Sequence, residues 1–330
     1  MPLGKRIDQS VANNVNHSAD AKPQTQTQRS PDESDATDGI TRFPLFQAEE
    51  PRFGFDEIIL NNDTYDAIQD MLAIYEKREL LFNTWGLGAT HKQHNRAGIN
   101  LYGASGTGKS MVAHAIASQL GRKILTVDYS QIESKYVGET SKNLVSMFDY
   151  AKESESVIFF DEADALLSKR VTDMSNSTDV SVNQTRSVLL ILINEHDDLI
   201  LFATNFITNY DPAFMRRILG HIKFELPDEE NRIKLWHMYI PHSLPSNADV
   251  QLLATKFDGV TGSDISNAVF TASLRSARLC EDIVQHSYFE DAIERIIRSK
   301  SDNNDLGTLV SKRVVSEEYV KSQFGGELPK

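Results

Sequence analysis

The sequence has a single cysteine, Cys280, among 330 residues. Because one cysteine cannot form a disulfide within its own chain, we expect a reducing, cytoplasmic setting and a small, buried Cys280 on a helix. No apolar run is long enough to span a membrane, and the N-terminus lacks the apolar segment of a secretory signal. The net charge of −13 argues against nucleic acid as a direct ligand, although a local basic groove stays open.

Apolar residues are also scarce at the start of the chain. Residues 1–50 are rich in Gln, Asn, Ser, Thr and Asp and cannot bury enough surface to offset their ordering entropy, so we predict a disordered tail. From residue 51 to 226, strand and helix patterns alternate, which predicts an α/β domain with a parallel sheet and helices on both faces. Over residues 227–330 strand signals fade, which predicts a smaller, all-helical lid domain with a C-terminal extension.

The α/β domain is predicted to contain short apolar strands and amphipathic helices. The strands span residues 99–102, 123–127, 157–160 and 199–203, and the helices span residues 63–82, 111–120, 143–153 and 182–195. In the lid domain, Asp228 is the predicted N-cap of a helix that ends at Tyr239. Further helices are predicted at residues 263–277 and 288–298.

A glycine-rich segment lies between the first predicted strand and the helix that follows it. It consists of Gly103, Ala104, Ser105, Gly106, Thr107, Gly108, Lys109 and Ser110, and it fits the Walker A pattern G-x-x-x-x-G-K-[ST]. Its glycines let successive backbone N–H groups face one centre at a helix N-terminus, which binds phosphates. Lys109 is expected to reach the β- and γ-phosphates, and Ser110 to bind Mg²⁺. The segment therefore predicts a P-loop NTPase sheet that binds ATP with magnesium.

Two acids, Asp161 and Glu162, follow the apolar strand at residues 157–160. Ligands of parallel sheets bind at the carboxyl ends of the strands, so both side chains are expected to face the nucleotide. Asp161 fits the carboxylate that holds Mg²⁺, mainly through water, and Glu162 fits the base that polarises the attacking water. The pair predicts hydrolysis of ATP to ADP and phosphate.

Further motifs follow in a fixed order. Asn205 comes just after the strand at residues 199–203, and the pair Arg216 and Arg217 lies shortly beyond it. The segments 133–140, 161–166 and 262–265 read ESKYVGET, DEADAL and GSDI. Together with the phosphate loop, this order of motifs from about residue 53 to 277 resembles the AAA ATPase family.

The resemblance implies roles for these residues. Asn205 would be a sensor that positions the lytic water beside Glu162. Arg216 would be an arginine finger that acts on ATP held by the neighbouring subunit, since a guanidinium stabilises the charge on the transferring phosphoryl group. Arg217 would be either a second finger or a partner in an interface ion pair. A finger that acts in trans needs a head-to-tail interface, so we expect a homohexamer with ATP.

At one position, the sequence departs from the pattern of many AAA family members. Leu219 stands where many family members carry a second arginine, three residues after the first. The adjacent-arginine arrangement is similar to that of the Vps-type, katanin and spastin branch and of stand-alone bacterial AAA ATPases.

The segment of Lys135, Tyr136, Val137 and Gly138 places an aromatic residue in a loop after the second predicted strand. By resemblance it is a pore loop, in which a ring of tyrosines grips an extended polypeptide, and the alternative is a tyrosine packed against the sheet. The leading hypothesis is a homo-oligomeric ring that couples ATP hydrolysis to unfolding, translocation or disassembly of protein substrates. Two alternatives stay open. One is a nucleotide-gated switch or assembly factor for a partner protease or nuclease, and the other is a nucleic-acid-linked AAA protein.

Overall fold

The structure is a computed structural model that describes residues 46–91, 98–128, 139–168, 177–196, 198–205 and 210–311. All of these residues belong to one compact unit, residues 44–330. The predicted tail up to residue 45 and the predicted pore loop at residues 135–138 lie outside the described residues. None of the helices in the described ranges combines the length and apolarity that crossing a membrane requires.

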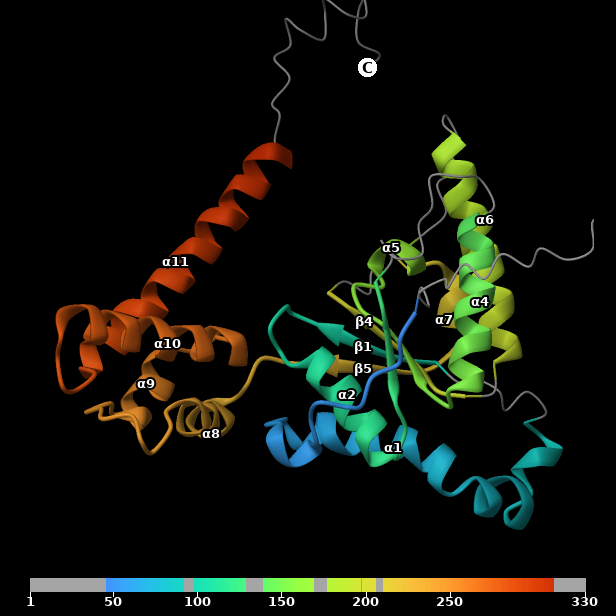
Figure 1. Cartoon of the computed structure of the whole chain (residues 1–330), viewed down its shortest axis with the longest axis horizontal. Coiled ribbons are helices and arrows are strands. Elements are labelled where there is room, and N and C mark those ends of the chain that lie inside the picture. Colours follow the sequence, from blue (N-terminus) through green and yellow to red (C-terminus); the bar gives the residue numbers. More distant parts are fainter. Residues whose placement is uncertain are drawn as a thin grey trace, which may run out of the picture. The chain divides into compact units, whose positions relative to one another are not determined.

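Five strands form one parallel sheet in the described part of the chain (Figure 1). They are β1 (Gly98–Gly103), β2 (Ile124–Val127), β3 (Val157–Phe160), β4 (Ile200–Thr204) and β5 (Ile218–Phe224). Their order across the sheet is β2-β3-β4-β1-β5, and every neighbouring pair is parallel. The predicted α/β fold with a parallel sheet is thus confirmed. All five strands end at the same edge, where ligands of such sheets bind.

The helices fall into two groups along the chain. The α/β part contains α1 (Asn62–Glu76), α2 (Lys109–Gln119), α4 (Glu139–Glu153), α5 (Asp164–Leu167), α6 (Ser177–Glu195) and α7 (Pro212–Met215), with short helical turns at Phe55–Glu57, Leu80–Thr84 and Leu87–Ala89. The C-terminal part contains α8 (Glu229–Tyr239), α9 (Val250–Lys256), α10 (Gly262–Leu279) and α11 (His286–Ser311). Every helix that the sequence pattern predicts is present. However, α1 ends at Glu76, before the predicted end at Phe82, and α4, α6 and α11 are longer than predicted.

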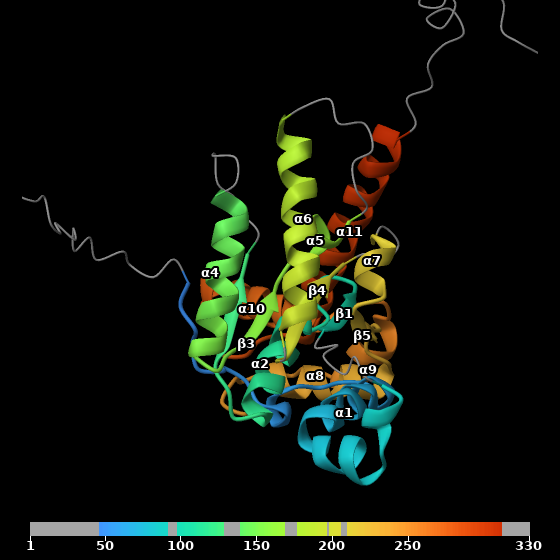
Figure 2. The same cartoon turned by 90° about the vertical axis from the view of Figure 1, so that its right-hand side faces the viewer.

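The sheet is buried on both faces, which explains the unbroken apolar run of β3. Ile158 and Phe160 lie in a core cluster with residues of α4 and α6, whereas Val157 and Phe159 lie in a second cluster with residues of α1 and α2. The helices α4 and α6 run alongside each other on their face of the sheet (Figures 1 and 2). Full burial of each of these large side chains contributes about 1.5–3 kcal/mol.

The helices α8 to α11 have a core of their own. Its buried residues all lie between Leu235 and Ile293. The rings of Trp236 and Phe289 meet edge-on with their centroids 6.2 Å apart. Asp228 caps α8 as predicted, because its side chain accepts a hydrogen bond of 2.8 Å from the Asn231 N–H.

The edge strand β5 was not predicted from the sequence. Its residues ILGHIKF mix glycine, histidine and lysine with apolar residues, so neither strict alternation nor an apolar run is visible. Gly220 is needed because α1 packs closely on the strand there: a Cβ at this position would lie 2.5 Å from Sδ of Met71. Only pairing with β1, a partner more than 110 residues earlier, makes this segment a strand.

Two further predictions need correction. Residues 46–50 were assigned to the disordered tail, but Phe46 is buried in the core, and Glu49 pairs with Ile124 of β2 through backbone hydrogen bonds of 2.8 and 2.9 Å. Packing against the sheet edge thus orders this segment. Cys280 was expected to be buried on a helix. It is exposed and follows the last residue of α10 with φ of 56°, the left-handed conformation that ends many helices.

Candidate active site

The phosphate loop joins β1 to α2 at the carboxyl edge of the sheet. Gly106 and Gly108 have φ of 80° and 95°, values that only glycine adopts without strain. Thr107 Oγ1 donates a hydrogen bond of 2.8 Å to the carbonyl oxygen of Ala104 and closes the loop. The first N–H groups of α2 have no partner within the helix, so the loop presents a concave site with positive potential. A concave site of positive potential is suitable for the phosphates of a nucleotide.

Lys109 lies inside this loop, and its side chain is almost buried. Nζ donates to the carbonyl oxygens of Gly103 and Ala104, both at 2.8 Å, and to Oδ1 of Asn205 at 3.0 Å. Burial lowers the pKa of Lys109, while the nearby carboxylates of Asp161 and Asp164 raise it. The ammonium is therefore held at the centre of the loop by three oxygens from two segments of the chain.

The two predicted acids differ in their contacts. Asp161 joins the loop to β3, because its Oδ2 accepts a hydrogen bond of 2.9 Å from Ser110 Oγ. Its Oδ1 accepts one of 3.0 Å from the Glu162 N–H. The side chain of Glu162 is exposed, and its backbone has φ of 51°. A non-glycine residue in the left-handed region is strained, and such strain is typical of functional sites.

Asp164 is a site residue whose individual role the sequence did not reveal. One of its carboxylate oxygens accepts a hydrogen bond from Thr204 Oγ1, and the other accepts one of 3.3 Å from the Asn205 N–H. Asn205 is thus fixed through its backbone by α5 and through its side chain by Lys109. The one available signal is the spacing in DEADAL, where Asp164 stands three residues after Asp161.

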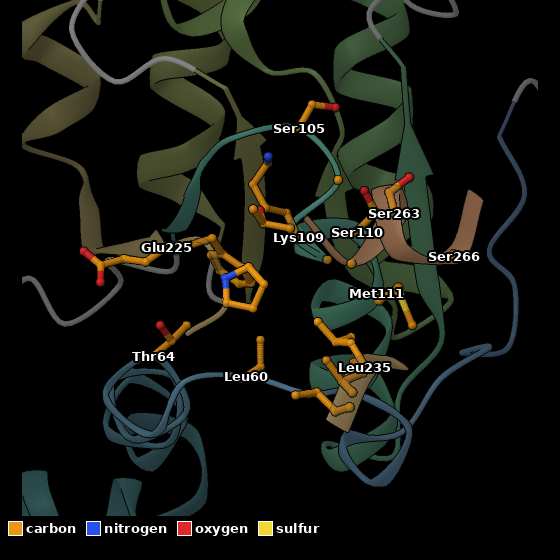
Figure 3. Close-up of a pocket in the computed structure, with 18 of the residues that line it drawn as sticks. Leu60, Thr64, Ser105, Lys109, Ser110, Met111, Glu225, Leu235, Ser263 and Ser266 are labelled. Carbon is orange, nitrogen blue, oxygen red and sulfur yellow. The ribbon is translucent and has the colours of Figure 1, made fainter. Parts of the chain in front are cut away.

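A cavity of about 450 Å³ opens beside the loop (Figure 3). Figure 3 shows Ser110 of α2 and Ser263 of α10 facing the same space, with Leu60 and Leu235 on its opposite side. The volume is in the usual range of small-molecule sites. Its wall also includes the segment from Glu57 to Asn61, which no sequence motif marks as functional.

The helical part of the chain contacts the loop directly. The Ser263 N–H donates a hydrogen bond of 3.3 Å to the carbonyl oxygen of Gly106. A Cβ on Gly106 would lie 2.8 Å from Thr261 Oγ1 and 2.9 Å from Ser263 Cβ. Thr261 caps α10 in a capping box with Asp264, so the N-terminus of α10 is fixed against the loop.

The predicted arginines lie at the opposite, amino-terminal ends of the strands. They follow α7 and directly precede β5, whose first residue, Ile218, pairs with Gly98 at the start of β1. The phosphate loop begins at Gly103, at the far end of β1, roughly 16 Å away along the strand. The structure therefore does not bring Arg216 and Arg217 to the loop of their own chain.

The two arginines also differ from each other. Arg217 Nε donates to Oδ1 of Asn194 on α6, and its Nη1 donates to the carbonyl oxygen of Ala213, both at 3.0 Å. Arg216 is exposed, and only its Nε is used, in a bond of 3.2 Å to the carbonyl oxygen of Pro212. The terminal nitrogens of Arg216 have no hydrogen-bond partner among the described residues.

Residues 99–226 match the protein family described as "ATPase family associated with various cellular activities (AAA)". The chain contains an AAA ATPase domain. The match covers the sheet, the phosphate loop, the acids of β3, Asn205 and the arginine pair.

Several relatives of known identity share this AAA domain. A proteasome-activating nucleotidase of Methanopyrus kandleri is 30% identical over 264 residues, which are 78% of this chain and 59% of that protein. A 26S proteasome regulatory subunit S10B homolog of Arabidopsis thaliana is 31% identical over 211 residues, 62% of this chain and 53% of that protein. A proteasome-activating nucleotidase of Saccharolobus solfataricus is 32% identical over 207 residues, 60% and 52% of the two chains.

The chain thus spans a little over half the length of these relatives. None of the three is a Vps-type, katanin or spastin protein, so the finer assignment of the AAA domain to that branch stays a prediction.

Proposed function

We propose that this protein is an ATPase that works as a homo-oligomeric ring, a hexamer, and couples ATP hydrolysis to unfolding, translocation or disassembly of protein substrates. One observation carries the proposal: Arg216 is exposed at the sheet edge opposite the phosphate loop of its own chain, and no described residue binds its terminal nitrogens. A complete hydrolytic site then needs two subunits, and a head-to-tail contact that repeats forms a ring when its rotation closes.

The residues around the cavity fit a nucleotide with magnesium. Lys109 and the N-terminus of α2 supply positive charge in a concave loop that is suitable for the β- and γ-phosphates. Ser110 Oγ and Asp161 Oδ2, 2.9 Å apart, are two oxygen donors of the kind that Mg²⁺ takes from proteins. No group of three or more His, Cys, Asp or Glu residues suited to a metal occurs in the described residues. Water and nucleotide phosphates would therefore supply the remaining ligands.

The proposed hydrolysis combines side chains of one subunit with one side chain of its neighbour. Bound Mg²⁺ would neutralise charge on the phosphates. Glu162 would polarise the attacking water, and Asn205, fixed by Lys109 and Asp164, would hold that water in place. Arg216 of the adjacent subunit would stabilise the charge that develops on the γ-phosphoryl group. Arg217 would hold α7 in position through Asn194 instead of acting as a second finger.

Complementation between two inactive variants tests this arrangement. Arg216→Ala and Glu162→Gln alone should each lower kcat by about a hundred-fold or more. In an equal mixture, a site is complete when an Arg216→Ala subunit receives Arg216 from a Glu162→Gln neighbour. About a quarter of the sites meet this condition, so about a quarter of the wild-type activity should return.

The controls separate the two arginines. A mixture of Arg216→Ala with the double variant Arg216→Ala/Glu162→Gln should stay inactive. Arg217→Ala should lose less than about ten-fold in kcat but unfold at a lower temperature, since its hydrogen bonds to Asn194 and Ala213 are lost. Full activity of Arg216→Ala as a dilute monomer would contradict a finger in trans.

Action on protein substrates is supported by the names of the relatives and by the sequence of the predicted pore loop. Tyr136→Ala should leave the ATPase rate within about two-fold and abolish unfolding of a tagged reporter protein, because the aromatic grip is lost. Tyr136→Phe, which keeps the ring, should retain unfolding. Unimpaired remodelling by Tyr136→Ala would contradict this part of the proposal.

A second function is favoured by the same names: a nucleotide-gated activator of a partner protease. In that case, ATP binding without hydrolysis should suffice. A Glu162→Gln ring that still stimulates cleavage of an unfolded substrate by the partner protease would support this alternative over a motor.

A further inference from the structure

A chain of polar side chains crosses the sheet between the nucleotide site and the arginine pair. Its members are Asp164, Thr204, Tyr210, Asn100 and His221. Asn100 is fully buried, Thr204 is 1% exposed and Tyr210 is 4% exposed. Buried polar groups are normally hydrogen-bonded, and these side chains satisfy one another along one continuous path. Such a network can couple the positions of the residues at its two ends.

The path begins at Asp164, which also holds the N–H of Asn205. Thr204 Oγ1 must donate its one proton to Asp164, because a carboxylate can only accept. Burial raises the pKa of the Tyr210 hydroxyl and so keeps it protonated, and Thr204 is a hydrogen-bond partner of that hydroxyl. Since the proton of Thr204 is already used, Thr204 accepts from Tyr210.

Tyr210 therefore has one proton and two acceptors. Its hydroxyl also donates to Asn100 Oδ1 at 3.3 Å. A single O–H bonds well to one oxygen at a time, so Tyr210 can favour Thr204, on the nucleotide side, or Asn100, on the arginine side. This is a two-state element of the kind that couples distant sites.

The path continues from Asn100 to the arginines. Asn100 Nδ2 lies 3.4 Å from His221 Nδ1 on β5. Burial lowers the pKa of His221, and a hydrogen bond with the backbone of Met215 raises it. Met215 is the last residue of α7, and Arg216 follows it directly.

A backbone route runs beside this side-chain route. Ser168, after α5, forms a bridge with Tyr210, and the Asp211 N–H donates to the carbonyl oxygen of Leu167 at 2.9 Å. Asp211 then caps α7, accepting from the Ala213 N–H at 2.8 Å. Displacement of α5, which carries Asp164, would thus move α7 and the arginine after it.

We propose that Tyr210 is a positioning residue that couples the nucleotide site of one subunit to the position of Arg216, which acts on the next subunit. The inference rests on the proposed function, since it needs a finger in trans. The Tyr210 hydroxyl then makes ATP turnover in the ring cooperative, because the state of one site sets the geometry of its neighbour.

Tyr210→Phe in the full chain tests the proposal, because it removes the hydroxyl and keeps the ring that packs in the core. The affinity for ATP of dilute, unassembled protein should stay within about two-fold. In the assembled ring, the Hill coefficient for ATP should fall to about one, and kcat should fall about three- to ten-fold. Doping with Glu162→Gln subunits should inhibit the variant in proportion to their fraction, but the wild type more steeply.

Tyr150→Phe is the matched control. Tyr150 lies on α4, is partly buried, and its hydroxyl accepts a hydrogen bond of 3.3 Å from the Ala48 N–H, which does not belong to the path. This variant should keep the wild-type Hill coefficient. Thr204→Val breaks the same path one link earlier, and its combination with Tyr210→Phe should lower the Hill coefficient no further than either change alone.

The outcomes distinguish a failure of the role of Tyr210 from a failure of the proposed function. Suppose that the wild-type ring is cooperative and that Tyr210→Phe has the same Hill coefficient as the wild type and Tyr150→Phe. This result would overturn the role of Tyr210 but not the proposed function. A wild-type ring with a Hill coefficient of one would also overturn it. A wild-type protein whose ATPase activity does not depend on assembly would overturn the proposed function and this inference with it.

Discussion

Replacing Gly106 by alanine should separate the contact between the phosphate loop and α10 from the strain of the loop itself. At φ of 80°, an alanine costs about 1–2 kcal/mol of backbone strain. Its Cβ would also lie 2.8 Å from Thr261 Oγ1 and 2.9 Å from Ser263 Cβ, closer than real Cβ contacts. Overpacking of this kind costs about 1–3 kcal/mol, so the free energy of unfolding should fall by about 2–5 kcal/mol.

Gly121→Ala is the matched control, because Gly121 has φ of 64° and nothing lies within 4 Å of the position that its Cβ would take. Urea unfolding of the nucleotide-free protein should give a loss of about 1–2 kcal/mol for this variant. Calorimetric titration should show unchanged ATP affinity for Gly121→Ala and weaker binding for Gly106→Ala, since α10 must move away from the cavity. Equal stability losses for the two variants, within about 0.5 kcal/mol, would refute the contact between Gly106 and α10.

Three further predictions concern other parts of the chain. Cys280→Gly should raise the free energy of unfolding by about 0.5–1 kcal/mol in urea titrations, because a glycine after α10 adopts φ of 56° without strain and Cys280 buries no core surface. Burial lowers the pKa of His114 below 6.5, so its contribution to stability should be complete above that pH and be lost as the pH falls below it. The urea midpoint of His114→Gln should therefore change less than that of the wild type between pH 7.5 and pH 5.5. Asn205→Ala should lower kcat by about 10–100-fold with ATP affinity nearly unchanged in equilibrium titrations, and a parallel loss of affinity would contradict a sensor role.

The sequence by itself determined the parts of this protein that depend on local chemistry. The phosphate loop follows from glycines that allow a positive φ, and β3 follows from a run of four apolar residues buried on both faces. The helix that begins after Asp228 follows from a side chain that bonds the N–H three residues later. Each signal lies within a few residues, so no knowledge of the rest of the chain is needed to interpret it.

Only the tertiary structure decided which polar residues act together. β5 becomes a strand through pairing with β1, and Asp164 gains its importance from Thr204 and Asn205 about 40 residues later. The sequence pattern does not distinguish the adjacent residues Arg216 and Arg217. In the structure, Arg217 is hydrogen-bonded to Asn194, whereas Arg216 is exposed. The reason is physical: hydrogen bonds and burial depend on distances in space, which the fold sets between segments far apart along the chain.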